Sequence, residues 1–267
     1  MKYILIIVFI IILVIVLSSY FKLDITYYNI KNKKIDKNLK IMFLSDLHNR
    51  NLVNKINDIL KKEKVDLIIL GGDMIQDSLY ESDNYIKLID SLENETLYYI
   101  YGNHEEHMKL KDEYTSLIKT KKLVLLNNKH IKLSNNIILY GLDSPQEKYL
   151  NFGKKALTKE YIFSELGELD SKRFNLLIAH NPLEFDSYVE SNYDLVLSGH
   201  VHGGIIILPF IGGLLSPDLT FFPKYYKGKY TKNNTSMIVS RGLGFSKKVP
   251  FRFLNSGEVV IINLMKE

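Results

Sequence analysis

Five short turns in the sequence carry side chains that bind metal ions in proteins. They are Asp46-Leu47-His48, Gly71-Gly72-Asp73, Gly102-Asn103-His104-Glu105, His180-Asn181-Pro182 and Gly199-His200-Val201-His202-Gly203-Gly204. Five of the seven histidines lie in these turns, and only His107 and His130 lie outside them. Carboxylate, amide and imidazole groups together suit divalent transition metals. The turns therefore predict a metal site.

The number of candidate ligands favours two ions over one. An Asp-x-His turn lets a carboxylate and an imidazole reach one cation, and a His-x-His turn presents two imidazoles on the same side of an extended backbone. The candidate ligands are Asp46, His48, Asp73, Asn103, His180, His200 and His202. A tetrahedral or octahedral site would not recruit all seven, whereas two ions that share Asp73 account for them. Any one turn alone is more often a capped turn, so the prediction rests on their joint occurrence.

Strands and helices alternate from residue 41 onward and position these turns. The predicted strands are Ile41–Ser45, Asp66–Leu70, Leu97–Tyr101, Leu123–Leu126, Ile137–Leu142, Asn175–Ala179, Tyr193–Ser198, Ser236–Ser240 and Glu258–Leu264. The predicted helices are Asn51–Lys62, Glu105–Lys119 and Lys159–Leu169. We expect an α/β fold of two packed mixed sheets with helices outside. Most of the turns directly follow a strand, where α/β sheets bind ligands. Gly72, Gly102 and Gly199 are expected to let the chain bend sharply there and to bring the ligands close together.

The motif series resembles the calcineurin-like metallophosphoesterase superfamily from Ile41 to Gly204. The later stretch, with Leu208-Pro209, Tyr225–Tyr230, Arg241-Gly242-Leu243-Gly244 and Arg252, is similar to a bacterial membrane-attached branch. Some members of that branch act on UDP-2,3-diacylglucosamine-type or other envelope substrates. Ile205 and Ser256-Gly257-Glu258 depart from the branch pattern, so the substrate stays open.

The resemblance implies a fold, a ligand set and a reaction. The fold is a four-layer αββα sandwich. The ligands of one ion are Asp46, His48, Asp73 and His202, and those of the other are Asp73, Asn103, His180 and His200. The reaction is hydrolysis of a phosphomonoester, phosphodiester or phosphoanhydride by a metal-activated hydroxide.

Three residues outside the ligand set are candidates for catalysis or substrate binding. His104 is expected to donate a proton to the leaving oxygen, with orientation of a ligand as the alternative role. Arg50 and Arg241 are candidate phosphate-binding residues. Glu105 is expected to begin a helix rather than to orient His104. The two divalent cations could be Mn²⁺, Fe²⁺ or Zn²⁺.

The N-terminus carries an apolar segment long enough to cross a bilayer. Residues 3–21 are uncharged and lie between Lys2 and Lys22. A cleaved signal peptide is the alternative, but Leu17-Ser18-Ser19 is a poor cleavage site. We therefore expect a transmembrane signal anchor over residues 1–22, a basic juxtamembrane tether near lipid headgroups over residues 23–40, and a metallophosphoesterase domain over residues 41–267.

Two features of the sequence predict opposite orientations for this anchor. Lysines are more numerous after the segment, which by the positive-inside rule would keep the domain in the cytoplasm. The N-terminal tail is only Met1 and Lys2, as in export signals, and this layout favours the outer face of the membrane. We expect a single-pass protein of the cell membrane with its catalytic domain outside.

Composition narrows the possible partners. The chain has no cysteine, so disulfides and thiolate ligands are excluded. The net charge of +5 comes mostly from lysine rather than from clustered arginine, which disfavours nucleic acid as a partner. A monomer acting on a phosphorylated small molecule or a lipid-linked or nucleotide-sugar substrate is expected. A nuclease or protein phosphatase with the same metal core, or a nonenzymatic metal-binding protein at the membrane, are the alternatives.

Overall fold

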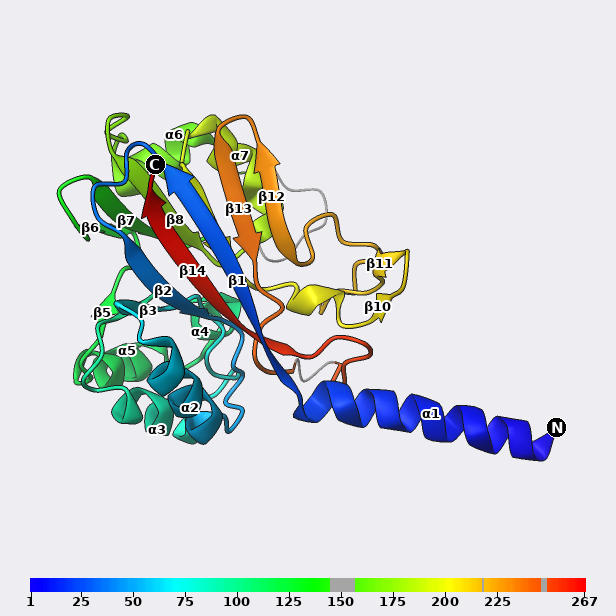
Figure 1. The fold of residues 1–267 in the computed structure, drawn as a ribbon. Coiled ribbons are helices and arrows are strands. Elements are labelled where there is room, and N and C mark those ends of the chain that lie inside the picture. Colours follow the sequence, from blue (N-terminus) through cyan, green and yellow to red (C-terminus); the bar gives the residue numbers. More distant parts are fainter. Residues whose placement is uncertain (145–156, 218, 246–248) are drawn as a thin grey trace.

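Two six-stranded mixed sheets form the centre of the molecule (Figure 1). The computed structural model describes residues 1–144, 157–217, 219–245 and 249–267. The first sheet has the order β1 (Leu23–Asn32), β14 (Gly257–Lys266), β2 (Leu39–Leu44), β3 (Leu67–Leu70), β4 (Leu97–Tyr99), β5 (Val124–Leu125). The second has the order β12 (Gly228–Lys232), β13 (Thr235–Val239), β9 (Leu195–Ser198), β8 (Phe174–Ala179), β7 (Ile137–Leu142), β6 (Lys129–Lys132). Antiparallel pairs β14–β2, β12–β13 and β6–β7 accompany the parallel ones, so both sheets are mixed.

The two sheets pack face to face because their strands are apolar on both sides. In β2, Ile41 and Phe43 belong to the core between the sheets, and Met42 and Leu44 belong to the core on the opposite face. The side chains of a strand alternate between its faces, so a continuous apolar run fills two cores at once.

Helices cover the outer face of each sheet. The first sheet is covered by α2 (Val53–Glu63), α3 (Asp83–Ser91) and α5 (Lys111–Lys119), and the second by α6 (Lys159–Leu166) and α7 (Phe185–Glu190). The helices bury side chains such as Ile56, Tyr114 and Ile162 against the sheets. These layers confirm the predicted αββα sandwich.

Two helix predictions have wrong boundaries. The helix predicted over Glu105–Lys119 is two helices, α4 (Asn103–Glu106) and α5, because the chain turns between them and buries Met108 in the core. The helix predicted to end at Leu169 ends at Leu166, because Gly167 follows with a φ of 79° that breaks the helix.

The apolar N-terminal segment forms the helix α1 (Lys2–Phe21), which projects from the sandwich (Figure 1). It is long and apolar enough to cross a membrane, and only 6% of its most apolar 18-residue stretch is buried in the protein. It is therefore not a core helix of the domain.

The tether expected over residues 23–40 is wrong for residues 23–32. These residues form β1, which pairs in parallel with β14 along its whole length. A strand of ten residues extends about 33 Å, so it carries the chain away from α1. The lysines that follow it are not beside the helix end: Lys34 pairs with Asp194 at 2.8 Å, and Lys40 pairs with Glu63 at 2.6 Å.

Candidate metal centre

The candidate ligands lie at the carboxyl ends of strands from both sheets. Asp46 and His48 follow β2, and Asp73 follows β3. In the second sheet, His180 directly follows β8 and the turn with His200 follows β9. Strands β2 and β3 are parallel neighbours, as are β8 and β9, so each pair ends at one edge of its sheet. The packing of the sheets brings the two edges together.

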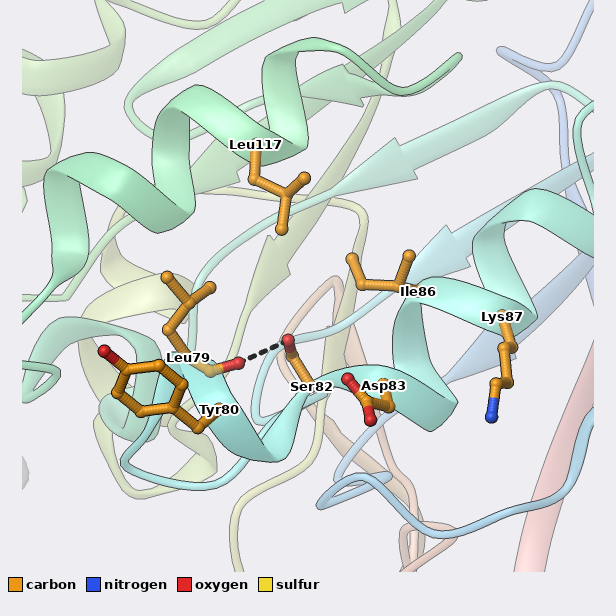
Figure 2. Close-up of a pocket in the computed structure, with 7 residues that line it drawn as sticks. All are labelled: Leu79, Tyr80, Ser82, Asp83, Ile86, Lys87 and Leu117. Carbon is orange, nitrogen blue, oxygen red and sulfur yellow. Dashed lines mark hydrogen bonds between the residues drawn. The ribbon is translucent and has the colours of Figure 1, made fainter.

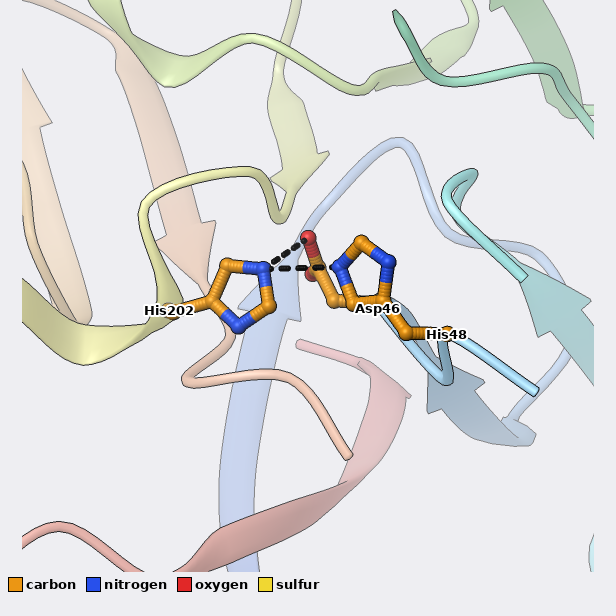
Figure 3. Close-up of side chains that lie close together, drawn as sticks. All are labelled: Asp46, His48 and His202. Carbon is orange, nitrogen blue, oxygen red and sulfur yellow. Dashed lines mark hydrogen bonds and ion pairs between the residues drawn. The ribbon is translucent and has the colours of Figure 1, made fainter. Parts of the chain in front are cut away.

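One group of ligands joins Asp46, His48 and His202 (Figure 3). All three residues are buried. The Nε2 atoms of His48 and His202 lie 2.9 Å apart, and Nε2 of His202 lies 3.5 Å from Oδ1 of Asp46. Two imidazole nitrogens and a carboxylate that converge in a dry site are the donor set of a transition-metal cation.

A second group joins Asp73, His180 and His200. Nε2 of His180 lies 3.2 Å from Oδ2 of Asp73. Nδ1 of His180 lies 2.7 Å from the carbonyl oxygen of Gly71, which can only accept, so this nitrogen donates. The hydrogen bond fixes the ring and leaves Nε2 facing Asp73, as in metal-binding histidines.

Asp73 lies within reach of both groups. It belongs to the second group, and its carboxylate also gathers with the rings of His48 and His104. Two further ligand atoms, Nδ1 of His48 and Oδ1 of Asn103, are buried without a hydrogen-bond partner in the part of the chain that the structure describes. Buried polar atoms are normally satisfied, so an unmet acceptor such as Oδ1 of Asn103 fits a site that takes cations.

The backbone at the ligands is strained. Five of the seven have positive φ, with values of 53° at Asp46, 47° at His48, 52° at Asp73, 70° at His200 and 49° at His202. Such a conformation costs non-glycine residues on the order of 1–3 kcal/mol and persists at functional sites. The strain therefore marks the same turns that the sequence motifs indicate.

The glycines beside the ligands act partly through close approach. Gly72 has a φ of 90°, which confirms its expected sharp bend. Gly102 and Gly199 do not have positive φ, and for these two glycines the structure shows the other expected effect, the close approach of the turns. A Cβ atom at Gly102 would overlap the carboxylate of Asp73, and one at Gly199 would overlap Ser45. Glycine at these two positions lets the turns approach each other.

The charges of the site depend on which groups face each imidazole. Burial lowers the pKa of His48 to about 3, with a further contribution from His104, so His48 is neutral. Burial also opposes a charge on His180, but the carboxylates of Asp73 and Asp46 raise its pKa to about 10. Burial raises the pKa of Asp46 to about 6. A buried cluster that mixes neutral and charged groups in this way is typical of a functional site.

His104 lies beside the ligands and contacts a carboxylate that the sequence motifs did not include. Its Nδ1 lies 2.6 Å from Oδ1 of Asp77, and its Nε2 lies 3.9 Å from Oδ2 of Asp73. Its side chain is 17% exposed. Burial opposes protonation, but Asp73 and the hydrogen bond with Asp77 raise the pKa of His104 to about 9. A pKa raised in this way favours the protonated imidazolium form of His104 at neutral pH.

Glu105 holds the turns of the site together and does not orient His104. Its buried carboxylate accepts hydrogen bonds from the backbone N–H groups of Asp73, Met74 and Gly102 and from the hydroxyl of Tyr99. It lies in the first turn of α4, as expected, and it also fixes the turn that carries Asp73.

Comparison with known proteins agrees with this geometry. Residues 39–204 match the family model described as calcineurin-like phosphoesterase. The chain belongs to the calcineurin-like phosphoesterase family. A metallophosphoesterase of Helicobacter pylori is 30% identical over 243 residues, which are 87% of this chain and 61% of that protein. One of Aquifex aeolicus is 29% identical over 265 residues and covers 93% of this chain and 94% of its own. TT1561 of Thermus thermophilus has a TM-score of 0.46 at 13% identity over 76% of this chain and 89% of its own.

Residues after the matched segment support the candidate metal centre. Arg252 is completely buried, and its guanidinium donates to the carbonyl oxygens of Gly244 and Arg241 at 2.9 and 2.7 Å. It also contacts Nδ1 of His202 at 3.2 Å. Nδ2 of Asn255 donates to the carbonyl of His202 at 2.7 Å. Of these two residues, only Arg252 stands out in the sequence, as part of the family resemblance, which assigns no role to this arginine.

The guanidinium groups of Arg50 and Arg241 are engaged within the protein. Arg50 donates to the carbonyl oxygens of Leu243 and Tyr20 and stacks over Phe245. Arg241 pairs with Asp24 at 3.1 Å and with Glu258 at 3.3 Å. Both arginines have structural partners, and phosphate binding by either stays a prediction.

Two hollows lie on the side of α3 and α5. One is lined by Leu79, Tyr80, Ile86, Leu117 and polar neighbours, and contains no metal-binding cluster (Figure 2). The other is lined by Asp77 and by residues 78–80 and 107–110. Because Asp77 contacts His104, the second hollow adjoins the candidate metal centre.

Proposed function

We propose that this chain hydrolyses a phosphate ester or phosphoanhydride with two divalent cations. Asp46, His48, Asp73 and His202 would hold one cation, and Asp73, Asn103, His180 and His200 would hold the other. The observation that carries the proposal is the pair of buried ligand groups with Asp73 within reach of both.

The chain's own residues supply the remaining parts of the reaction. Divalent cations, when bound, lower the pKa of water and offset the charge of the phosphate. His104 donates a proton to the leaving oxygen, for which its partly exposed ring and raised pKa are suited. Asp77 orients the ring through Nδ1, so that Nε2 is the atom that faces the centre.

The hollow beside Asp77 is the proposed place of the leaving group. Its lining combines the apolar side chains of Leu79, Tyr80 and Met108 with Lys109. A leaving group bound there would lie next to His104. An apolar lining with few polar groups is typical of sites for small ligands.

We also propose that α1 anchors the phosphoesterase in the cell membrane, with the domain on the outer face. The helix is uncharged between Lys2 and Lys22, and its surface is exposed. Its last residues contact the domain: Ser19 is buried, and the ring of Tyr20 stacks on Phe245 with centroids 4.7 Å apart. These contacts support a retained anchor over a cleaved signal. A lipid-linked or nucleotide-sugar substrate fits an enzyme held at the bilayer.

The test is a hydrolysis screen of the full chain in detergent with added Mn²⁺. The substrates are bis-p-nitrophenyl phosphate, nucleotide sugars and phospholipids. The full chain is needed because β1 belongs to the first sheet, and a shorter domain would lose this edge strand. We expect hydrolysis that a chelator abolishes and that Asp46→Asn lacks. A folded, metal-loaded chain that hydrolyses none of these would contradict the proposal.

A further inference from the structure

Seven large apolar side chains are exposed on two segments that follow the metal centre. They are Phe210, Ile211, Leu219, Phe221, Phe222, Phe251 and Leu254. Phe210 is fully exposed, and the others are between 39% and 66% exposed. Soluble proteins seldom leave several large apolar side chains together in water, and such a group marks a contact surface.

The two segments form one surface because their backbones pair. Ile206 bridges to Phe253, and the N–H of Ile207 donates to the carbonyl of Phe253 at 3.0 Å. Within the first segment, the hairpin of β10 (Ile207–Leu208) and β11 (Gly212–Gly213) presents Phe210 at its tip. The N–H of Phe222 donates to the carbonyl of Leu214 at 3.0 Å, and this hydrogen bond joins the stretch with Phe221 and Phe222 to the hairpin. We refer to the seven side chains as the apolar loop surface.

This surface is continuous with the end of α1. Leu254 lines one hollow together with Val14 and Ile15 of α1. The N–H of Asn255 lies 3.4 Å from the hydroxyl oxygen of Ser19. Figure 1 shows that the β10–β11 hairpin projects from the sandwich on the same side as α1. A bilayer crossed by α1 would therefore lie next to the hairpin.

The chemistry of the segment fits a bilayer. Residues 205–223 contain a single charged residue in the sequence, Asp218, and are rich in phenylalanine, isoleucine and leucine. Lys224 and Lys227 follow directly, beside the rings of Tyr225 and Tyr226. An apolar tip flanked by lysine and tyrosine matches the order of a membrane interface, from acyl chains to anionic headgroups.

We propose that the apolar loop surface inserts into the bilayer that α1 crosses. The inference rests on the proposed anchor but not on the proposed reaction. The first segment begins at Ile205, three residues after His202, so insertion would hold the metal centre near the headgroups. Apolar faces that bind at this level enter about 5–10 Å into the membrane. A substrate phosphate carried on a lipid headgroup could then reach the centre without leaving the bilayer.

The chain contains no tryptophan, so a single introduced tryptophan reports on its own surroundings. We would prepare the full chain with Phe210→Trp and, as the matched control, with Tyr80→Trp. Tyr80 is 84% exposed on η1 (Leu79–Glu81), which directly precedes α3 in the chain. Figure 1 shows α3 on the opposite side of the molecule from the hairpin. Each variant is reconstituted into phosphatidylcholine–phosphatidylglycerol vesicles, with and without bromine on the acyl chains.

In vesicles, Phe210→Trp should emit at shorter wavelength and lose most of its emission to the brominated lipid, whereas Tyr80→Trp should keep a water-exposed spectrum. Equal spectra and equal quenching of the two variants would overturn the inference. A blue shift of Phe210→Trp without bromine quenching would assign the surface to another copy of the chain and also overturn it. Flotation of the same vesicles tests the anchor separately: a floating chain with an unquenched Phe210→Trp contradicts the surface alone. A chain that does not float contradicts the anchor, and with it the inference.

Discussion

Nδ1 of His104 lies 2.6 Å from Oδ1 of Asp77. This contact fixes the imidazole ring and leaves its other nitrogen toward Asp73, 3.9 Å away. In other enzymes, too, a carboxylate that contacts Nδ1 of a catalytic histidine holds its ring in one orientation. In the proposed reaction the two residues have separate roles: Asp77 contacts the histidine, and His104 would contact the substrate.

His104→Ala should lower kcat while metal content and folding stay nearly unchanged. A general acid contributes on the order of 10²- to 10⁴-fold. The loss should be smallest for nitrophenyl esters, whose leaving groups need little protonation, and largest for alkyl esters. The measurement is a leaving-group series on both proteins, with metal analysis in parallel. An equal loss across the series would give His104 an electrostatic or positioning role, and loss of metal would make it a ligand.

Asp77→Asn should show a weaker form of the same dependence on the leaving group. The amide can still contact Nδ1, but it no longer stabilises the charged ring, so the effect should be smaller than that of His104→Ala. Asp83→Asn, an acidic residue at the start of α3, is the control and should leave kcat unchanged. If Asp77→Asn and Asp83→Asn have equal kcat, the proposed orientation of His104 by Asp77 is wrong.

The purified protein should contain close to two transition-metal ions, and chelation should abolish hydrolysis reversibly. The reason is the presence of two ligand groups. Elemental analysis alongside activity is the measurement. Full activity with one tightly held ion would contradict the two-metal proposal.

Asp73→Ala should reduce metal content more than His48→Ala. Asp73 lies within reach of both groups, whereas His48 has its closest ligand contact in His202, at 2.9 Å. Metal analysis of both variants after dialysis is the test. Equal metal content and equal activity would show that Asp73 does not bridge.

Arg252→Met should destabilise the fold strongly. The substitution leaves the carbonyl oxygens of Gly244 and Arg241 buried without this donor, at a cost of about 1–3 kcal/mol for each. Arg173→Met is the matched control, because Arg173 pairs with Asp170 on the surface and its loss should cost no more than about 0.5 kcal/mol. Urea unfolding of both variants measures the difference, and equal midpoints would contradict the structural role.

The grouping of the candidate metal ligands was predictable from the sequence because each of these residues lies in a local turn at a strand end. The turns are short, and their glycines, aspartates and histidines lie close together in the chain. Strands such as β2 and β8 were predictable for the same reason, since continuous apolar runs bounded by turns indicate buried strands.

The residues that support the site were not predictable in this way. Asp77 reaches His104 only because the loop after β3 packs beside α4. Arg252 reaches His202 across 50 residues of sequence. Such contacts depend on the packing of both sheets, and no spacing in the sequence records them.

Residues 23–32 contain a sequence pattern that favours a strand, but the lysines around it pointed to a tether instead. Ile25, Thr26, Tyr27, Tyr28 and Ile30 are residues that favour strands. The strand lies at a sheet edge and is mostly half-exposed, so it lacks the continuous apolar run of a central strand. Its charged neighbours suggested a solvated segment instead.

The pairing of β1 with β14 also sets the order in which the molecule can be assembled. Partners such as Asn29 and Asn263 are 234 residues apart, and β14 lies between β1 and β2 in the sheet. During synthesis, β1 and β2 must wait for almost the entire domain before the strand that joins them is available. Long-range pairing of this kind slows folding and leaves strand edges open. A newly made chain held at the bilayer by α1 would keep β1 in place through this interval, while β2, which carries Asp46 and His48 at its end, can already pair with β3.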